Sequence, residues 1–79
     1  MWSKGTVRVP AEDGTYTVIK YEVKHYAEPS EWGYEGGRAS KIWLQQDGRE
    51  VYCFERGETR QLQTPEAAAA LAAILKEYN

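Results

Sequence analysis

The chain has 79 residues, so it forms one small domain (residues 1–79) whose single core supplies little net stability. Its formal net charge is −2, and no basic block indicates direct nucleic-acid binding, because cations and carboxylates are interspersed along the chain. No apolar run reaches the length of a membrane span, no signal-peptide core is present, and the single cysteine cannot form an internal disulfide, so we expect a soluble cytoplasmic protein.

Alternating apolar residues predict two strands in the first third of the chain. The first spans residues 2–9 and turns Val7 and Val9 to one face. The second spans residues 15–26 and places Ile19, Tyr21 and Val23 on one face. These apolar faces are expected to share one side of a sheet.

The sequence Asp13-Gly14 predicts a turn between these strands. A two-residue turn there would pair Val9 with Val18, whereas a three-residue loop would pair Val9 with Ile19. Because register follows the buried face, we favour the three-residue loop with a bulge.

An irregular segment, residues 28–38, follows the second predicted strand. It combines Trp32 and Tyr34 with three glycines, and with the carboxylates of Glu28, Glu31 and Glu35. Loops of this length are usually functional or disordered, and disordered segments avoid aromatic residues. The segment is therefore predicted to be an ordered loop that presents or binds something.

Two further strands are predicted around Asp47-Gly48, the strongest short hairpin signal in the chain. Folding the chain at this turn predicts three cross-strand pairs. Leu44 meets Val51 and Ile42 meets Cys53 on one face, and Trp43 meets Tyr52 on the other.

A helix is predicted near the C-terminus, where Thr64 is an N-cap and Pro65 suits the first helical position. An apolar stripe, extended by small residues, requires the helix to dock on the sheet. The expected fold class is α+β: a four-stranded antiparallel sheet of two hairpins, with one C-terminal helix packed on one face. The stripe consists of Leu71, Ile74, Leu75 and Tyr78, and its extension of Ala67, Ala68 and Ala72.

A single helix covers only one face of such a sheet. The other face is expected to carry Trp2, Trp43, Tyr52 and Phe54 among charged residues. This face is a hydrated aromatic surface, a dimer interface or the floor of a binding site. Because an exposed aromatic face favours association, these four residues are the predicted interface of a homo-oligomer, at least a dimer.

Candidate catalytic and metal-binding residues are few. Cys53 and His25 are the single residues of their types, and the strand pattern points Cys53 into the core, where a thiol is inert. The loop carboxylates lack the ligand spacing of a calcium loop, and one histidine with one cysteine does not make a zinc site. We therefore expect a protein that is not an enzyme and that uses no cofactor or metal.

Two segments that contain glycine and arginine, residues 36–38 and 56–60, are the candidate ligand-binding segments. Glycines let backbone N–H groups approach an anion, and arginine binds phosphate with two donors, although Gly-Gly also simply serves turns. If both segments lie at one edge, they would form a pocket for a planar, phosphorylated ligand. The predicted set is Trp32, Tyr34, Gly36, Gly37, Arg38, Arg56 and Arg60.

The run from His25 to Lys41, followed by a strand, Asp47-Gly48 and a short alanine/leucine helix ending in residues 76–79, resembles a family of small uncharacterised proteins. Its members occur in Gram-positive bacteria and their phages or mobile elements, and the resemblance covers nearly the whole chain. A phage setting implies a protein that acts by binding in the cytoplasm of the bacterial host. Such proteins sequester a defence signal, such as a cyclic nucleotide, or block a defence protein.

Two function hypotheses follow. The first is a non-enzymatic, phage-type anti-defence protein that sequesters a small phosphorylated nucleotide signal. The alternative is a protein–protein inhibitor or adaptor that blocks a host defence protein through the acidic aromatic loop. In the alternative, Trp32, Tyr34 and Trp43 are anchors, and Glu31 and Glu35 steer association.

Overall fold

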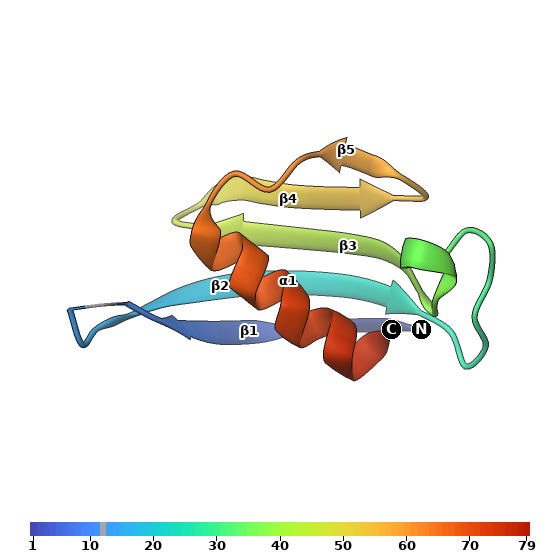
Figure 1. Cartoon of the computed structure of the whole chain (residues 1–79), viewed down its shortest axis with the longest axis horizontal. Helices are drawn as coiled ribbons and strands as arrows, with labels where there is room; N and C mark the ends of the chain where they lie inside the picture. Colours follow the sequence, from blue (N-terminus) through green and yellow to red (C-terminus); the bar gives the residue numbers. More distant parts are fainter. Residues whose placement is uncertain (12) are drawn as a thin grey trace.

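Five antiparallel strands follow one another in chain order to form a single sheet, and one helix crosses one face of it (Figure 1). The computed structural model describes residues 1–11 and 13–79. The predicted α+β class, with its antiparallel sheet and C-terminal helix, is confirmed. The elements are β1 (Trp2–Pro10), β2 (Tyr16–His25), the short 3-10 helix η1 (Tyr34–Gly36), β3 (Ala39–Gln46), β4 (Arg49–Glu55), β5 (Glu58–Arg60) and α1 (Pro65–Tyr78).

The number of strands differs from the prediction, because β5 adds a fifth strand at the edge of the sheet beside β4. A tight turn precedes it, in which Glu55 N–H donates to the Gly57 carbonyl at 2.8 Å. The strand has only three residues. That length is too short for alternation to be recognised in the sequence.

The predicted faces of β1 and β2 are confirmed, but both candidate registers are wrong. Ile19 and Val23 are fully buried, and Val9 is nearly so. The pairing places Val7 opposite Ile19 and Val9 opposite Thr17. β1 ends at Pro10 and β2 begins at Tyr16, so the connection has five residues in place of the expected three-residue loop. This shifts the register by two residues and leaves the buried faces unchanged.

The Asp47-Gly48 turn is confirmed, with positive φ at both residues and Gln46 opposite Arg49. The three predicted pairs beyond it are wrong, because a bulge intervenes: Gln45 faces Glu50, whereas Leu44 faces Tyr52. The extra residue in β4 reverses the faces of all residues that follow it.

The bulge puts Tyr52 and Phe54 on the face covered by the helix, not on the exposed face where they were predicted. Tyr52 is 0% exposed and Phe54 9% exposed. Cys53 is half-buried on the opposite face, where it pairs with Trp43, and not in the core. Two aromatic rings bury more apolar area than one cysteine, which favours this register.

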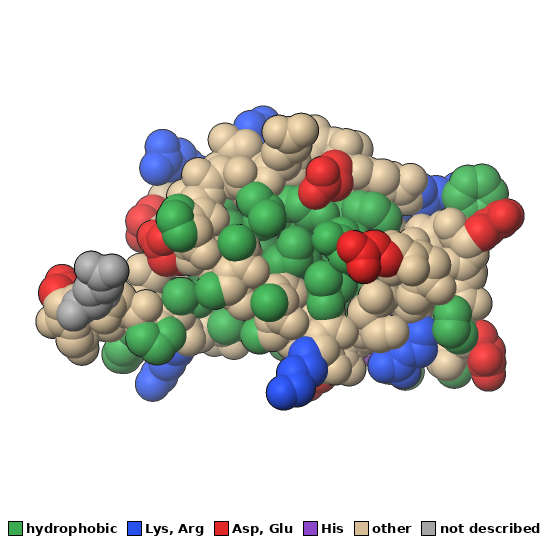
Figure 2. All heavy atoms as spheres, viewed as in Figure 1, with side chains coloured by type: hydrophobic (Ala, Val, Ile, Leu, Met, Phe, Trp, Pro, Cys, Tyr) green, Lys and Arg blue, Asp and Glu red, His purple; other side chains and the backbone are tan. Residues whose placement is uncertain are grey.

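The helix begins as predicted. Thr64 Oγ1 accepts a hydrogen bond from Ala67 N–H at 3.0 Å and donates to Gln46 Oε1 at 2.6 Å. Leu71 and Ile74 are buried, and Leu75 and Tyr78 pack against the core. Of the alanines, Ala67 and Ala70 are buried, whereas Ala68 and Ala72, predicted to extend the stripe, are exposed. Figure 2 shows hydrophobic side chains gathered beside α1 in the middle of this face.

Aromatic side chains hold the C-terminal end of α1 on β2. The hydroxyls of Tyr21 and Tyr78 are 2.9 Å apart, and the ring of His25 lies 4.8 Å from that of Tyr78. His25 Nε2 is also 2.8 Å from Ser3 Oγ. The hydrogen bond to Tyr78, together with burial, raises the pKa of Tyr21 to about 12.

We expect the protein to lose stability between about pH 10 and pH 12, because of Tyr21. The unfolded chain releases this proton near the usual pKa of 10.0, whereas the folded chain retains it until about 12. The stabilisation by protonated Tyr21 is therefore complete below pH 10, and it is lost as the pH rises through the pKa of Tyr21 in the folded chain. Tyr78→Phe removes the hydrogen bond, so its urea midpoint should fall less steeply with pH. An unchanged slope would contradict this account.

Candidate functional site

The aromatic loop, residues 26–38, closes on itself through backbone hydrogen bonds. Ser30 N–H donates to the Gly37 carbonyl at 3.1 Å, and Gly33 N–H donates to the Ser30 carbonyl at 3.0 Å. A β-carbon at Gly33 would lie 1.8 Å from the Gly37 carbonyl oxygen. The loop is thus an ordered turn whose two sides touch at a glycine.

The N–H groups predicted to hold an anion are engaged within the loop. Gly36 N–H donates to the Gly33 carbonyl at 3.0 Å, and Gly37 N–H donates to the Tyr34 carbonyl at 2.9 Å. Gly37 also packs against the side chain of Asn79, so closely that a β-carbon at Gly37 would clash with Asn79 Oδ1. A phosphate would have to displace these hydrogen bonds to bind here.

The three candidate arginines do not converge. The Arg56 guanidinium lies over the Trp32 ring, with its carbon 5.8 Å from the ring centroid. Arg38 Nε donates to the backbone carbonyl of Asn79 at 3.5 Å. Arg60 forms an ion pair with Glu50 at 3.0 Å. The structure therefore brings together Trp32 and Arg56, whereas the side chains of Arg38 and Arg60 interact with other groups.

Trp32 and Tyr34, the two aromatic residues in the middle of the loop, differ in their surroundings. Tyr34 packs edge-on against Phe54, with ring centroids 5.1 Å apart, and so belongs to the border of the core. Trp32 is 56% exposed. Of these two rings, Trp32 is therefore the one exposed to solvent.

Cys53 and His25 lie on opposite faces of the sheet. Cys53 is beside Trp43 on the face without the helix, whereas the His25 ring packs on Tyr78 of α1. They therefore do not form a nucleophile–base pair. Among the described residues, no group of three or more His, Cys, Asp or Glu side chains is placed to hold a metal.

The sheet face opposite α1, which we call the open face, carries most of the cations of the protein. It receives alternate residues of β1 and β2, the residues of β3 and β4 that pair with them, and Arg60 of β5. The carboxylates on this face are Glu22, Glu50 and Glu55. Its cations are Lys4, Arg8, Lys20, Lys24, Lys41 and Arg60.

Two of these cations are neutralised by neighbours. Lys41 pairs with Glu55 at 3.1 Å and Arg60 with Glu50 at 3.0 Å. Trp43 Nε1 donates to the second oxygen of Glu50 at 3.2 Å, which fixes the indole in place. The remaining cations cluster on β1 and β2.

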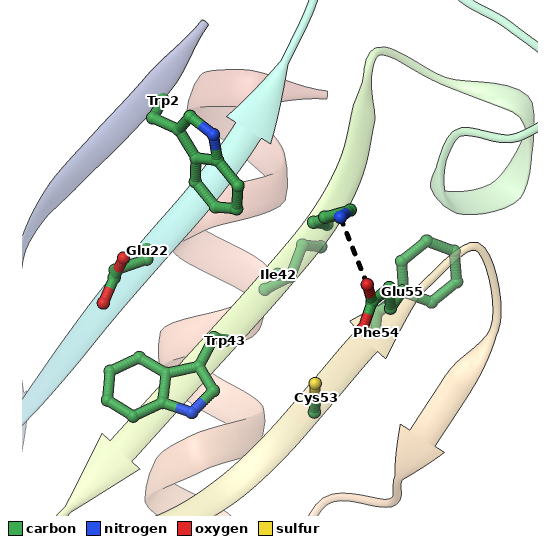
Figure 3. A pocket seen from close by; sticks show the side chains of 8 residues that line it. Trp2, Glu22, Ile42, Trp43, Cys53, Phe54 and Glu55 are labelled. Carbon is green, nitrogen blue, oxygen red and sulfur yellow. Dashed lines mark ion pairs between the residues drawn. The ribbon is translucent and has the colours of Figure 1, made fainter.

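Two adjoining grooves indent the open face. The Trp groove, about 300 Å³, lies between Trp2 and Trp43, with Glu22 on one side and the Lys41–Glu55 pair on the other (Figure 3). Its volume is at the lower end of the range for small-molecule sites.

The second groove, which we call the Lys groove, has a volume of about 380 Å³. Lys4 and Lys20 line it, and it shares Glu22 and Trp43 with the Trp groove. Neither lysine forms an ion pair with another described residue. An aromatic site therefore adjoins a cationic one.

The predicted oligomer interface is only partly on this face. Trp2 is 51% exposed and Trp43 is half-buried, whereas Tyr52 and Phe54 belong to the core.

The Tyr52 hydroxyl is buried without a hydrogen-bond partner among the described residues, and burial raises the pKa of this group.

Sequence reasoning missed the open face as a cationic surface. The signal was present, because Lys4, Arg8, Lys20 and Lys24 fall on the strand faces opposite the apolar residues of the two strands. Along the chain such charges look dispersed. Folding two strands side by side gathers them on one face.

In the described part of the chain, no helix has the length and apolar character that crossing a membrane requires. No curated protein and no solved structure matches the sequence. One family description, a domain of unknown function, DUF7678, matches residues 1–79. The chain therefore belongs to the DUF7678 family.

Proposed function

We propose that the protein is a non-enzymatic binding protein whose ligand is a nucleotide, bound in the two grooves of the open face. The observation that carries this proposal is that the two grooves adjoin. Trp2 and Trp43 flank the Trp groove, and Lys4 and Lys20 line the Lys groove next to it. A nucleotide has the matching parts, a planar base joined to a phosphate.

Each groove supplies an ordinary interaction with one part of this ligand. A base stacks on an indole ring, and the hydrogen bond from Trp43 to Glu50 holds one such ring in position before the ligand arrives. The ammonium groups of Lys4 and Lys20 attract the phosphate. Glu22, shared by both grooves, is an acceptor for an exocyclic amino group of the base.

The open face supports nucleotide binding better than the aromatic loop does. Gly36 and Gly37 of the loop use their N–H groups internally, and the side chains of Arg38 and of Arg60 in β5 interact with other groups. Only Arg56 remains beside an exposed aromatic ring.

The biological setting of this proposal comes from the resemblance to small phage proteins. We propose that nucleotide binding sequesters a defence signal in the bacterial cytoplasm. Homo-oligomer formation through Trp2 and Trp43 stays a prediction, and a dimer that uses these residues would compete with the ligand.

Titration of the protein with linear and cyclic nucleotides tests the proposal. We expect saturable quenching of tryptophan fluorescence and a rise in melting temperature. The double variant Lys4→Gln/Lys20→Gln should lose the response, and the matched control Arg38→Gln/Arg56→Gln should keep it. Loss of the response in the control alone would move the site to the loop.

A second candidate function is protein binding through the aromatic loop. It is favoured by the exposure of Trp32 next to the exposed carboxylates of Glu31 and Glu35. A flat response to every nucleotide, with a defence protein that binds the wild type but not Trp32→Ala, would support this function in place of the first.

A further inference from the structure

We infer that the open face binds single-stranded nucleic acid, with the strand continuing from the two grooves along β1 and β2. This inference rests on the proposed nucleotide site and extends it to a polymer. It starts from the cations and aromatic rings that a mononucleotide in the grooves would leave unused.

Unused groups lie at both ends of the open face. At one end, the Arg8 guanidinium carbon lies 4.9 Å from the centroid of the Tyr16 ring, which is 54% exposed. At the other end, Lys24 Nζ lies 5.8 Å from the Tyr26 ring, and 6.0 Å from the ring of Trp2, which also flanks the Trp groove. Cations and aromatic rings thus recur along the full length of the strands.

The length of the surface suits several nucleotides. β2 has ten residues, which corresponds to about 30 Å at the usual rise of a strand. Single domains that bind single strands contact about four nucleotides or more. The open face is long enough for a site of this size.

The charge distribution favours a polyanion in one orientation. The protein has a net charge of −2, yet the cations of the open face outnumber its carboxylates six to three. The remaining surface, which includes Glu28, Glu31 and Glu35 of the loop, is correspondingly acidic. A nucleic acid is therefore attracted to the open face and repelled from the rest of the molecule.

A single strand fits this surface better than a duplex. Stacking on Trp2, Trp43 or Tyr16 requires an unpaired base with a free ring face, which a duplex does not offer. The open face also presents no helix to a major groove, because α1 lies on the other side of the sheet (Figures 1 and 3).

Glu22 predicts a preference among bases. Its carboxylate lies at one side of the Trp groove, where it would repel phosphate and accept a hydrogen bond from an amino group of the base (Figure 3). Cytosine carries such an amino group, and thymine does not. We expect oligodeoxycytidylate to bind about fivefold more tightly than oligothymidylate, because one ordinary hydrogen bond changes a dissociation constant by about this factor.

Fluorescence anisotropy with labelled deoxycytidylates of increasing length tests the inference. Affinity should rise from the mononucleotide to at least about four nucleotides and then level off. It should fall between about 50 and 200 mM salt, with a slope that Arg8→Gln reduces by about 0.7. The control Lys76→Gln, on the exposed side of α1, should leave length dependence and salt slope unchanged.

The outcomes separate the inference from the proposed function. Equal affinity for mononucleotide and oligomer, or equal affinity for duplex and single strand, would overturn the inference and leave the nucleotide site standing. Failure to bind any nucleotide would overturn both. A stable dimer in light scattering that dissociates in Trp43→Ala would also overturn it, because a second copy would then occupy the face.

Discussion

Leu44→Ala is expected to lower the free energy of unfolding by about 2–5 kcal/mol, the usual cost of a leucine-sized cavity in a core. Leu44 is 0% exposed and lies on β3, in the middle of the sheet, under α1. The net stability of small domains is only about 5–15 kcal/mol, so this variant should be largely unfolded at moderate urea concentrations.

The matched control is Val18→Ala on the open face. Val18 is 43% exposed, and its truncation should change the unfolding free energy by about 0.5 kcal/mol or less. Urea denaturation of both variants measures the difference. A cost for Val18→Ala as large as that for Leu44→Ala would mean that the open face is covered in solution.

Gly33→Ala is expected to break the closure of the aromatic loop. The new β-carbon would stand 1.8 Å from the Gly37 carbonyl oxygen, which is backbone and cannot swing aside. Overpacking of this kind costs about 1–3 kcal/mol. We expect a lower melting temperature and faster hydrogen exchange at Ser30, whose N–H donates to that carbonyl.

The control for this variant is Gly36→Ala. Gly36 has a φ of +74° and no atom within 4 Å of a β-carbon, so the substitution adds backbone strain of about 1–2 kcal/mol without crowding. Only Gly33→Ala should speed exchange at Ser30. Nucleotide binding by folded Gly33→Ala should match that of the wild type, and its loss would indicate that the loop forms the site.

Much of the fold could be predicted from local sequence signals. Alternation assigned the buried faces of β1 and β2, Asp47-Gly48 placed a turn, and Thr64-Pro65 placed the start of α1. Each of these signals acts within a few residues. They are therefore readable without knowledge of the remaining chain.

Features that depend on long-range packing could not be predicted. The bulge in β4 exchanges Cys53 for Tyr52 in the core, and the alternation of apolar residues is equally compatible with either choice. The end of the chain is another case. Asn79 Nδ2 donates to the Tyr34 carbonyl, and Asn79 Oδ1 accepts from Ala39 N–H, contacts that span 45 and 40 residues.

The candidate site shows the same limit. Trp32 and Arg56 belong to the two segments that would form a pocket if they met at one edge, and these two residues do lie together, because both loops are at one end of the sheet. The cationic open face depends instead on the pairing of β1 with β2 and of β2 with β3. Its lysines and tryptophans come together only once the registers are known.

The indole N–H resonances of the three tryptophans give the most direct test of the open face as the binding surface. Each is assigned by a Trp→Phe variant, and the protein is then titrated with an oligodeoxycytidylate. Binding on the open face should shift the resonances of Trp2 and Trp43 and leave that of Trp32 in place. A shift of Trp32 alone, or no shift at any indole, would contradict it.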